Sequence, residues 1–222
     1  MRTFSPSSSA ARTPPLDPNC IERAVAASAA LPQRFAQRSP LKAPKEKPRT
    51  VFTIGHSTRP WEEFRDLLRV HGIKRVVDVR TIPRSRHNPQ FNRETLAPKL
   101  RSARIGYVHM GKLGGLRHAR RDSINTGWRN SSFRGYADYM QTPEFSQALD
   151  RLIELAAEKP CAIMCAEAVP WRCHRSLIAD ALAVRGIPVA DIISASAPRP
   201  HSLTPFAKVE GPRITYPSSA GA

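Results

Sequence analysis

From residue 50 to residue 193, short apolar runs alternate with segments whose apolar residues recur at helical spacing. The short runs are typical of buried strands and predict strands at 51–54, 74–79, 107–110, 161–165 and 187–193. The helical stripes predict helices from Pro60 to a stop at Gly72 and at 93–104, 142–156 and 174–185. Strands that alternate with helices favour an α/β fold, a three-layer sandwich with a mostly parallel sheet of about five strands.

The two ends of the chain lack this pattern. Residues 1–49 are rich in proline, serine and basic residues, and we expect a disordered arm with at most a short helix at 20–31. Residues 50–195 are the predicted α/β domain, and residues 196–222 a loosely structured tail. The first 15 residues lack the apolar segment of a secretory signal, and we expect a cytoplasmic protein. Their composition also overlaps that of an organellar transit peptide, which stays an alternative.

Polar and basic loops follow the predicted strands, at 55–58, 80–92, 111–121 and 166–175. In open parallel sheets, ligands bind outside the carboxyl ends of the strands. We therefore expect these four loops to meet at one end of the sheet and to form one site.

Charge narrows the class of ligand. The chain has 35 Lys and Arg against 18 Asp and Glu, a net charge of +17. Residues 74–134 alone hold 15 basic and three acidic residues, a net of +12. Such a block favours a nucleic acid, an anionic membrane face or an anionic small molecule, and solvated surface charge is the alternative. No apolar run reaches the roughly 18 residues that a membrane span needs, and we expect no membrane partner.

The fourth of these loops is the richest in chemistry. Cys165 is predicted to end a strand, and Cys173 to begin a helix, where backbone N–H groups favour a thiolate or a bound anion. Glu167 between them is a candidate for pairing an arginine or moving a proton. Arginines can hold a phosphate or carboxylate with two hydrogen bonds. The candidate site residues of this loop are Cys165, Glu167, Arg172, Cys173, His174 and Arg175. Packing in the core is the alternative for Cys165, and Cys161 is predicted to be a core residue.

Two further loops add candidates. In the loop at 80–92, arginines provide phosphate contacts and an aromatic ring a stacking face for a base, unless that ring anchors the loop to the core. The candidates there are Arg80, Pro83, Arg84, Ser85, Phe91 and Asn92. In the loop at 55–58, Gly55 permits close backbone approach, Ser57 can cap the next helix, and His56 is an acid–base candidate or a hydrogen-bonded structural histidine.

A zinc site is an alternative for this cluster, with Cys165, Cys173 and His174 joined by His56, His87 or His109. The sequence has neither a CxxC nor an HxxxH pair, and we predict no metal and no cofactor. The segment GKLGGLR at 111–117 lacks the ending of a nucleotide-phosphate loop. A thiol redox sensor without a substrate is a third class of function.

Taken together, the motifs resemble the family called domain of unknown function 488. They are TIGHST at 53–58, DVRxxPRS at 78–85, PxFN at 89–92, LGG at 113–115, RGY at 134–136, YM at 139–140, CAE at 165–167 and CHR at 173–175. The resemblance covers about residues 50–193 and implies a small, mostly bacterial α/β domain whose motifs gather in one pocket. Members of the family are often labelled DNA repair proteins, but the resemblance implies no reaction.

The leading hypothesis is therefore a nucleic-acid-associated protein that holds a phosphate or a base in this pocket. In it, Cys165 or Cys173 is a nucleophile or redox group, and His56 or Glu167 moves the proton. The alternative is an enzyme acting on an anionic small molecule through the same residues. The sequence leaves catalysis and the oligomeric state open.

Overall fold

The computed structural model describes residues 49–218. Six strands form one sheet in the order β3-β2-β4-β1-β5-β6. The first five of these strands pair in parallel, and only β6 is antiparallel to its neighbour. The strands of this sheet are β1 (Val51–Gly55), β2 (Arg75–Asp78), β3 (Gly106–His109), β4 (Cys161–Cys165), β5 (Val189–Ile192) and β6 (Arg199–Pro200). The mostly parallel sheet is confirmed, and it has one strand more than expected.

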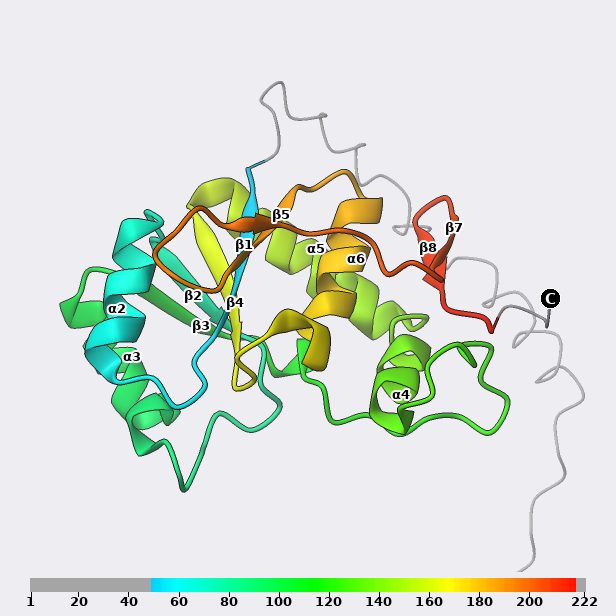
Figure 1. Cartoon of the computed structure of the whole chain (residues 1–222), viewed down its shortest axis with the longest axis horizontal. Coiled ribbons are helices and arrows are strands. Elements are labelled where there is room, and N and C mark those ends of the chain that lie inside the picture. The colour runs from blue at the N-terminus through cyan, green and yellow to red at the C-terminus, as the bar shows by residue number, and fades with distance from the viewer. Residues whose placement is uncertain (1–48, 219–222) are drawn as a thin grey trace, which may run out of the picture. The chain divides into compact units, whose positions relative to one another are not determined.

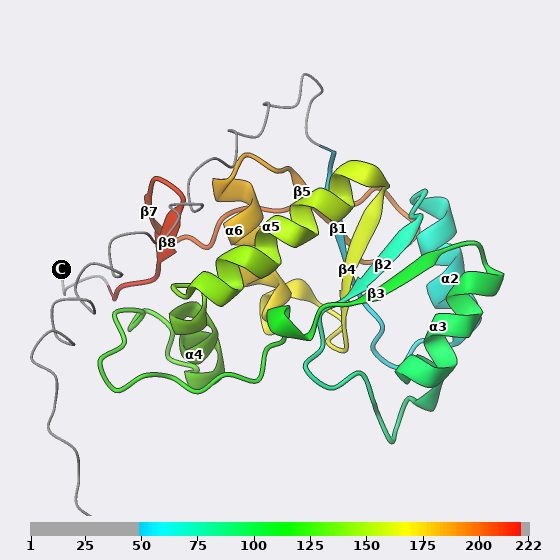
Figure 2. The ribbon, with the colours of Figure 1, turned by 180° about the vertical axis from the view of Figure 1, so that it is seen from behind.

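Helices cover both faces of the sheet (Figures 1 and 2). One face packs on α2 (Trp61–Val70) and α3 (Arg93–Ser102), and the other on α5 (Pro143–Glu158) and α6 (Arg175–Val184). The central strand β4 shows why two cores form, because successive side chains of a strand point to opposite faces. Its odd-numbered residues belong to the core below α5 and α6, and Ala162 and Met164 to the core below α2 and α3. The predicted three-layer sandwich is confirmed.

The order of the strands places the site. The chain runs from β1 through α2 to β2 and through α3 to β3, always on one face, whereas α5 and α6 connect β3, β4 and β5 on the other. The strands β2 and β4 lie side by side. From the carboxyl end of β2 the chain continues through α3 on one face of the sheet, and from the carboxyl end of β4 it continues through α6 on the opposite face. Ligand sites of open α/β sheets form where connections diverge in this way.

Of the predicted helices, only α5 begins at a side-chain cap in the described residues. The predicted capping of α2 by Ser57 is wrong, because α2 begins after Pro60 and has no side-chain cap. Thr142 caps α5, because its hydroxyl accepts a hydrogen bond from the amide of Phe145 at 3.3 Å. Pro98 stands inside α3, and the helix continues past it. The sequence pattern did not predict α4 (Ser131–Tyr139), which begins after the cap Asn130. This helix is short and contains Gly135, so its apolar periodicity is weak.

Short helical turns shape the loops between these elements. They are η1 (Pro89–Phe91), η2 (Gly111–Leu113) and η3 (Pro170–Arg172). The turn η3 matters most, because it shortens the path from the end of β4 to the start of α6 and carries Cys173 back towards Cys165.

Residues 196–218, where we expected a loosely structured tail, contain β6 and a small hairpin, β7 (Lys208–Glu210) with β8 (Arg213–Thr215). Tyr216 is fully buried, and its hydroxyl donates a hydrogen bond to Asp180 at 2.8 Å. The same carboxylate accepts hydrogen bonds from Thr204. Polar anchoring of this kind leaves little hydrophobic periodicity in the sequence, which explains why the tail did not read as structured.

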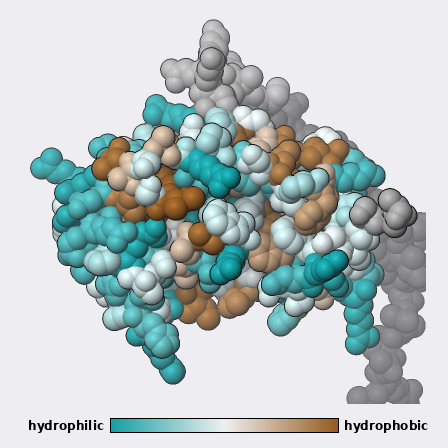
Figure 3. Space-filling model, viewed as in Figure 1, coloured by the Kyte–Doolittle hydropathy of each residue, from teal (hydrophilic) through white to brown (hydrophobic). Residues whose placement is uncertain are grey.

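The predicted arm of residues 1–49, with its short helix at 20–31, falls almost wholly outside the described residues. Among residues 49–218, no helix is long and apolar enough to cross a membrane. On the face of the molecule shown in Figure 3, hydrophobic residues lie in separate patches between hydrophilic ones.

Candidate functional site

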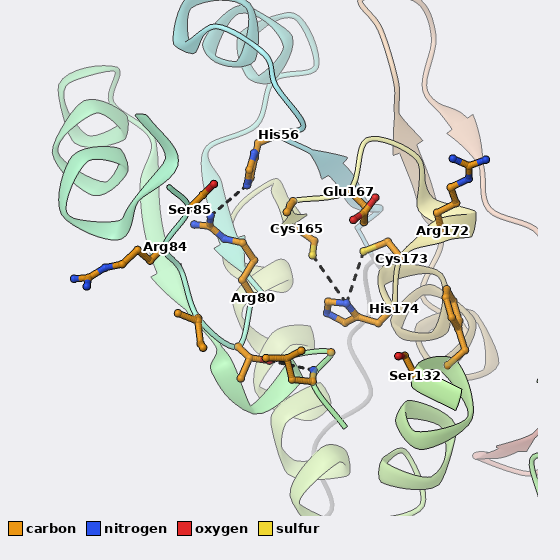
Figure 4. A pocket seen from close by; sticks show the side chains of 16 residues that line it. His56, Arg80, Arg84, Ser85, Ser132, Cys165, Glu167, Arg172, Cys173 and His174 are labelled. Carbon is orange, nitrogen blue, oxygen red and sulfur yellow. Dashed lines mark hydrogen bonds between the residues drawn. The ribbon is translucent and has the colours of Figure 1, made fainter. Parts of the chain in front are cut away.

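A pocket of about 320 Å³ opens at the carboxyl end of the sheet. As the sequence predicts, the loops that follow β1, β2, β3 and β4 all contribute to its wall. Nine of the predicted site residues line it: His56, Arg80, Arg84, Ser85, Cys165, Glu167, Arg172, Cys173 and His174 (Figure 4). The other six, Gly55, Ser57, Pro83, Phe91, Asn92 and Arg175, support the wall from behind.

The turn after β1 lies against the turn after β4. A side chain at Gly55 would place its Cβ 1.8 Å from the carbonyl oxygen of Glu167, so only glycine fits there. The amides of His56 and Ser57 donate to the carbonyls of Cys165 and Ala166 at 3.0 and 2.9 Å. Ser57 has a φ of 47°, a backbone conformation that costs a non-glycine residue energy. These contacts hold His56 at the floor of the pocket.

His56 is a buried, neutral histidine. Its ring stacks on Phe91 with a centroid distance of 4.3 Å, and its Nδ1 donates to the carbonyl of Ser57 at 2.8 Å. Its Nε2 lies 3.2 Å from a guanidinium nitrogen of Arg80, which leaves this ring nitrogen as the acceptor. Burial, together with the charge of Arg80, lowers the pKa of His56 to about 4. A substrate can reach the Nε2 lone pair only if Arg80 moves.

Arg80 and Asp78 form a buried ion pair. The guanidinium donates to both carboxylate oxygens of Asp78, at 2.8 and 2.6 Å, and to the carbonyl of Phe91 at 2.8 Å. Tyr107 donates a further hydrogen bond to the same carboxylate at 2.8 Å. Arg80 is 6% exposed and lines the pocket. It therefore presents a fixed cationic edge, with most of its donors already used.

Cys165, Cys173 and His174 form a cluster on the opposite wall. The His174 Nδ1 lies 3.7 Å from the sulfur of Cys173 and 4.0 Å from that of Cys165 (Figure 4). Hydrogen bonding from the Cys165 thiol, with help from the charge of Arg175, holds the pKa of Cys173 well below its usual range. The same hydrogen bond, together with burial, raises the pKa of Cys165. Of the two thiols, Cys173 is therefore the one that loses its proton more readily.

Arg175 does not reach the pocket as a ligand-binding arginine would. Its side chain is 1% exposed and donates to the sulfur of Cys173, the hydroxyl of Thr53 and the carbonyl of Glu167, at 3.4, 3.2 and 2.7 Å. Thr53 in turn donates to Asp191 at 2.7 Å. Arg175 therefore braces the loop that carries Cys173, and its partner on Glu167 is the backbone rather than the carboxylate.

The loop at 80–92 is held by its own polar contacts. The side chain of Asn92 accepts a hydrogen bond from the amide of Ser85 at 2.6 Å, and the carbonyl of Pro83 accepts one from Arg93 at 2.9 Å. Phe91 is fully buried, so the stacking face that we expected for a base is not accessible. The second interpretation of Phe91, an anchor to the core, is the one that the structure shows.

The sequence missed seven residues of the pocket wall: Thr81, Ile82, Gly115, Leu116, Ser132, Phe133 and Ala166. The glycine pair at 114–115 was the available signal for one of them. A Cβ at Gly115 would lie 2.5 Å from the Nδ1 of His174, so glycine allows the two segments to touch. Ser132 and Phe133 belong to α4, a helix that was not predicted.

Comparison with known proteins identifies a family. A family model described as Domain of unknown function DUF488 matches residues 60–182, which is more than half of the chain. The search of curated proteins finds no match, and neither does the search of solved structures. The matched residues run from the loop before α2 into α6 and include most of the pocket wall. The resemblance seen in the motifs is thereby confirmed, and the chain belongs to the DUF488 family.

Proposed function

We propose that the pocket binds a small anionic substrate and that the protein is an enzyme acting on it. One observation carries this proposal: cationic and reactive side chains from separate loops line the same pocket of about 320 Å³. Pockets of a few hundred Å³ take small molecules. Polar groups that converge in such a pocket are the usual mark of a binding or active site.

The cationic groups act at two depths. Arg80 is buried and fixed by Asp78, whereas Arg84 and Arg172 are exposed and extend from opposite sides of the pocket (Figure 4). Within residues 49–218, the one ion pair of the Arg84 side chain is a long contact of 3.7 Å to Glu94. Both guanidinium groups point outward in Figure 4, and rotation of these exposed side chains towards an anion that enters between them would form charge-assisted hydrogen bonds to it.

The reactive groups lie deeper. The sulfur atoms of Cys165 and Cys173 and the ring of His174 line the pocket, and Glu167 is exposed on its wall. A carboxylate in this position can take a proton from a bound group and return it. In this proposal Arg84 and Arg172 hold the anion, the Cys–Cys–His cluster acts on it, and Glu167 moves the proton.

Anion binding is tested by calorimetric titration of the full chain with inorganic phosphate, pyrophosphate and succinate. One charge-assisted hydrogen bond contributes about 1.5 kcal/mol, so Arg172→Ala should weaken binding of the preferred anion about tenfold. Arg151→Ala is the matched control, because it removes the same charge from an exposed position on α5 that pairs only with Glu154. Equal weakening in both variants, or no binding of any of the three anions, contradicts the proposal.

The catalytic part needs a second readout. Turnover is sought with a panel of phosphate and carboxylate esters, and Glu167→Gln should lower kcat about 100-fold if Glu167 moves the proton. Anion affinity should stay within about threefold, because Glu167 is not one of the cationic groups that hold the anion. A variant that keeps full kcat removes Glu167 from the mechanism.

The excess of positive charge in residues 74–134 supports a second candidate, association with a nucleic acid. Residues 74–134, with a net charge of +12, supply the loop at 80–92 and the segment 111–130 beside the pocket. A basic surface that continues beyond a pocket favours a polymer. In this case the pocket holds one phosphate or nucleotide of a longer strand.

Salt dependence separates the two candidates. Fluorescence anisotropy with single-stranded and duplex DNA and RNA should show affinity that falls steeply between about 50 and 200 mM salt if several phosphates are contacted. Arg84→Ala should then lower the salt slope by about one, and Arg151→Ala should leave it unchanged. Affinity for the nucleic acids that is equal in all three proteins assigns the pocket to the small anion alone.

A further inference from the structure

Three potential metal ligands meet in the pocket, one at the end of β4 and two just before α6. The sulfur atoms of Cys165 and Cys173 and the Nδ1 of His174 all lie within 4.8 Å of one another. Seven residues separate the two cysteines, and the chain closes this gap through η3, so the pair does not form a short zinc motif in the sequence. Two cysteines and one histidine are the protein ligands of one known class of catalytic zinc site.

The distances are close to those of a bound ion. Bond lengths of about 2.3 Å to sulfur and about 2.05 Å to nitrogen place tetrahedral ligands ~3.6 Å apart for sulfur to nitrogen and ~3.8 Å apart for sulfur to sulfur. The Nδ1 of His174 lies 3.7 and 4.0 Å from the two sulfurs. A contraction of a few tenths of an ångström brings both nitrogen-to-sulfur distances to these values, and the two sulfurs lie within 4.8 Å of each other.

The ring of His174 is oriented as a metal ligand. Its Nε2 lies 3.2 Å from the backbone carbonyl of Val79, which only a protonated Nε2 can bond. The Nδ1 therefore carries the lone pair, and this lone pair faces both sulfurs (Figure 4). Histidine ligands commonly donate their second N–H to a carbonyl in this way, which fixes the tautomer and the ring. Gly115 and the ring of Tyr136, whose centroid lies 5.0 Å away, hold the imidazole from other sides.

We propose that Cys165, Cys173 and His174 bind a zinc ion whose fourth coordination position opens into the pocket. All three ligands line the pocket, so a water molecule or a substrate oxygen can occupy that position. Thiolate and imidazole donors select zinc over the hard cations magnesium and calcium. Binding converts any protonated ligand thiol to a thiolate, and the released proton passes to solvent.

Neighbouring groups fit this arrangement. Arg175 donates to the sulfur of Cys173 at 3.4 Å, and hydrogen-bond donors behind a metal site commonly stabilise its thiolate ligands in this way. The sequence offered three histidines as a fourth ligand, and each is engaged or located elsewhere. The Nε2 of His56 faces Arg80, His109 is hydrogen-bonded to the carbonyl of Arg80, and His87 is exposed. The open position is thus left to the pocket, where the zinc ion would polarise the anionic substrate of the proposed function.

The test is a zinc titration of the untagged full chain. The chain is stripped of metal with a chelator, kept reduced and titrated against a chromophoric chelator, and cobalt(II) is then added as a spectroscopic probe. Cys20→Ser is the background for every variant, because that cysteine lies outside the described residues. We expect one equivalent of zinc, and thiolate-to-cobalt charge-transfer bands. Cys173→Ser and His174→Ala should each lower the affinity at least 100-fold.

Cys161→Ala is the matched control. This cysteine lies on the same strand as Cys165, is fully buried and faces the core, so its loss should leave zinc affinity within about threefold. Far-ultraviolet circular dichroism of each variant confirms folding. Absence of zinc binding by the reduced background protein, or binding that survives both Cys173→Ser and His174→Ala, overturns the proposal. The titration uses no substrate, so its result is independent of whether the pocket proves to bind anions.

Discussion

The buried imidazole of His56 makes the stability of the protein depend on pH. The folded protein keeps this ring neutral because burial lowers its pKa from 6.5 to about 4. An unfolded chain takes up the proton near pH 6.5. The contribution of His56 to the free energy of unfolding is therefore full above pH 6.5 and decreases as the pH falls from 6.5 towards 4. Below pH 4 this contribution stays constant, because the ring is then protonated in both the folded and the unfolded state.

The size of the effect follows from the two pKa values. Linkage between pH 7.5 and pH 4.5 gives a loss of about 2.5 kcal/mol from His56 alone. The side chain is 1% exposed, so solvent screening reduces this figure little. Carboxylates also titrate in this range, and the comparison must therefore be made with a variant that lacks only the imidazole.

The assay is urea unfolding followed by tryptophan fluorescence, with a chelator present so that no metal contributes. The free energy of unfolding is measured at pH 7.5, 6.5, 5.5 and 4.5 for the wild type and for His56→Gln. The variant will be less stable at pH 7.5, because it loses the stacking on Phe91. Its additional loss towards pH 4.5 should be smaller than that of the wild type by about 2.5 kcal/mol. Parallel curves would refute the reasoning and show that His56 titrates in the folded state as it does in the unfolded one.

Two further substitutions test packing at and near the site. Gly115→Ala should destabilise the fold by about 1–3 kcal/mol, because its Cβ would lie 2.5 Å from the ring of His174. Gly106→Ala is the control: the nearest atom to its Cβ is 3.6 Å away, and it should lower the free energy of unfolding by less than about 1 kcal/mol. Equal losses for the two variants in urea unfolding would contradict the close contact. Tyr216→Phe should lower stability by about 1.5–3 kcal/mol, since the hydroxyl bonds the buried carboxylate of Asp180; a thermal midpoint equal to that of the wild type would show that the tail is not anchored there.

Much of the fold could be predicted because its signals are local. The strands of a parallel sheet are buried on both faces and read as continuous apolar runs, as in CAIMC at 161–165. The cap and proline at 142–143 likewise fixed the start of α5. The helix α4 and the tail lacked such signals. Their stability comes from contacts between distant residues, such as the hydrogen bond of Asn125 to the amide of Tyr216.

The sequence predicted where the candidate site lies in the fold, but not what each of its residues does there. The rule that ligands bind at the carboxyl ends of parallel strands brought the right loops together. The roles depend on which side of a loop each residue faces, and spacing does not encode this. Arg175 and Arg172 are three residues apart, yet one is buried behind the wall and the other is exposed on it.

The same reasoning explains why the sequence offered Cys165, Cys173 and His174 only as an alternative zinc site, and why we predicted no metal. Familiar zinc motifs place two ligands two to five residues apart, because a single turn or one helix face then presents both. Here the first ligand ends a strand and the other two precede a helix, and a turn that starts at Pro170 returns the chain across the gap. The tautomer of His174 depends on Val79, which lies 95 residues away in the chain. A ligand set of this kind is a property of the sheet edge, so metal sites in other parallel α/β folds should be sought among cysteines and histidines at adjacent strand ends, whatever their spacing in the sequence.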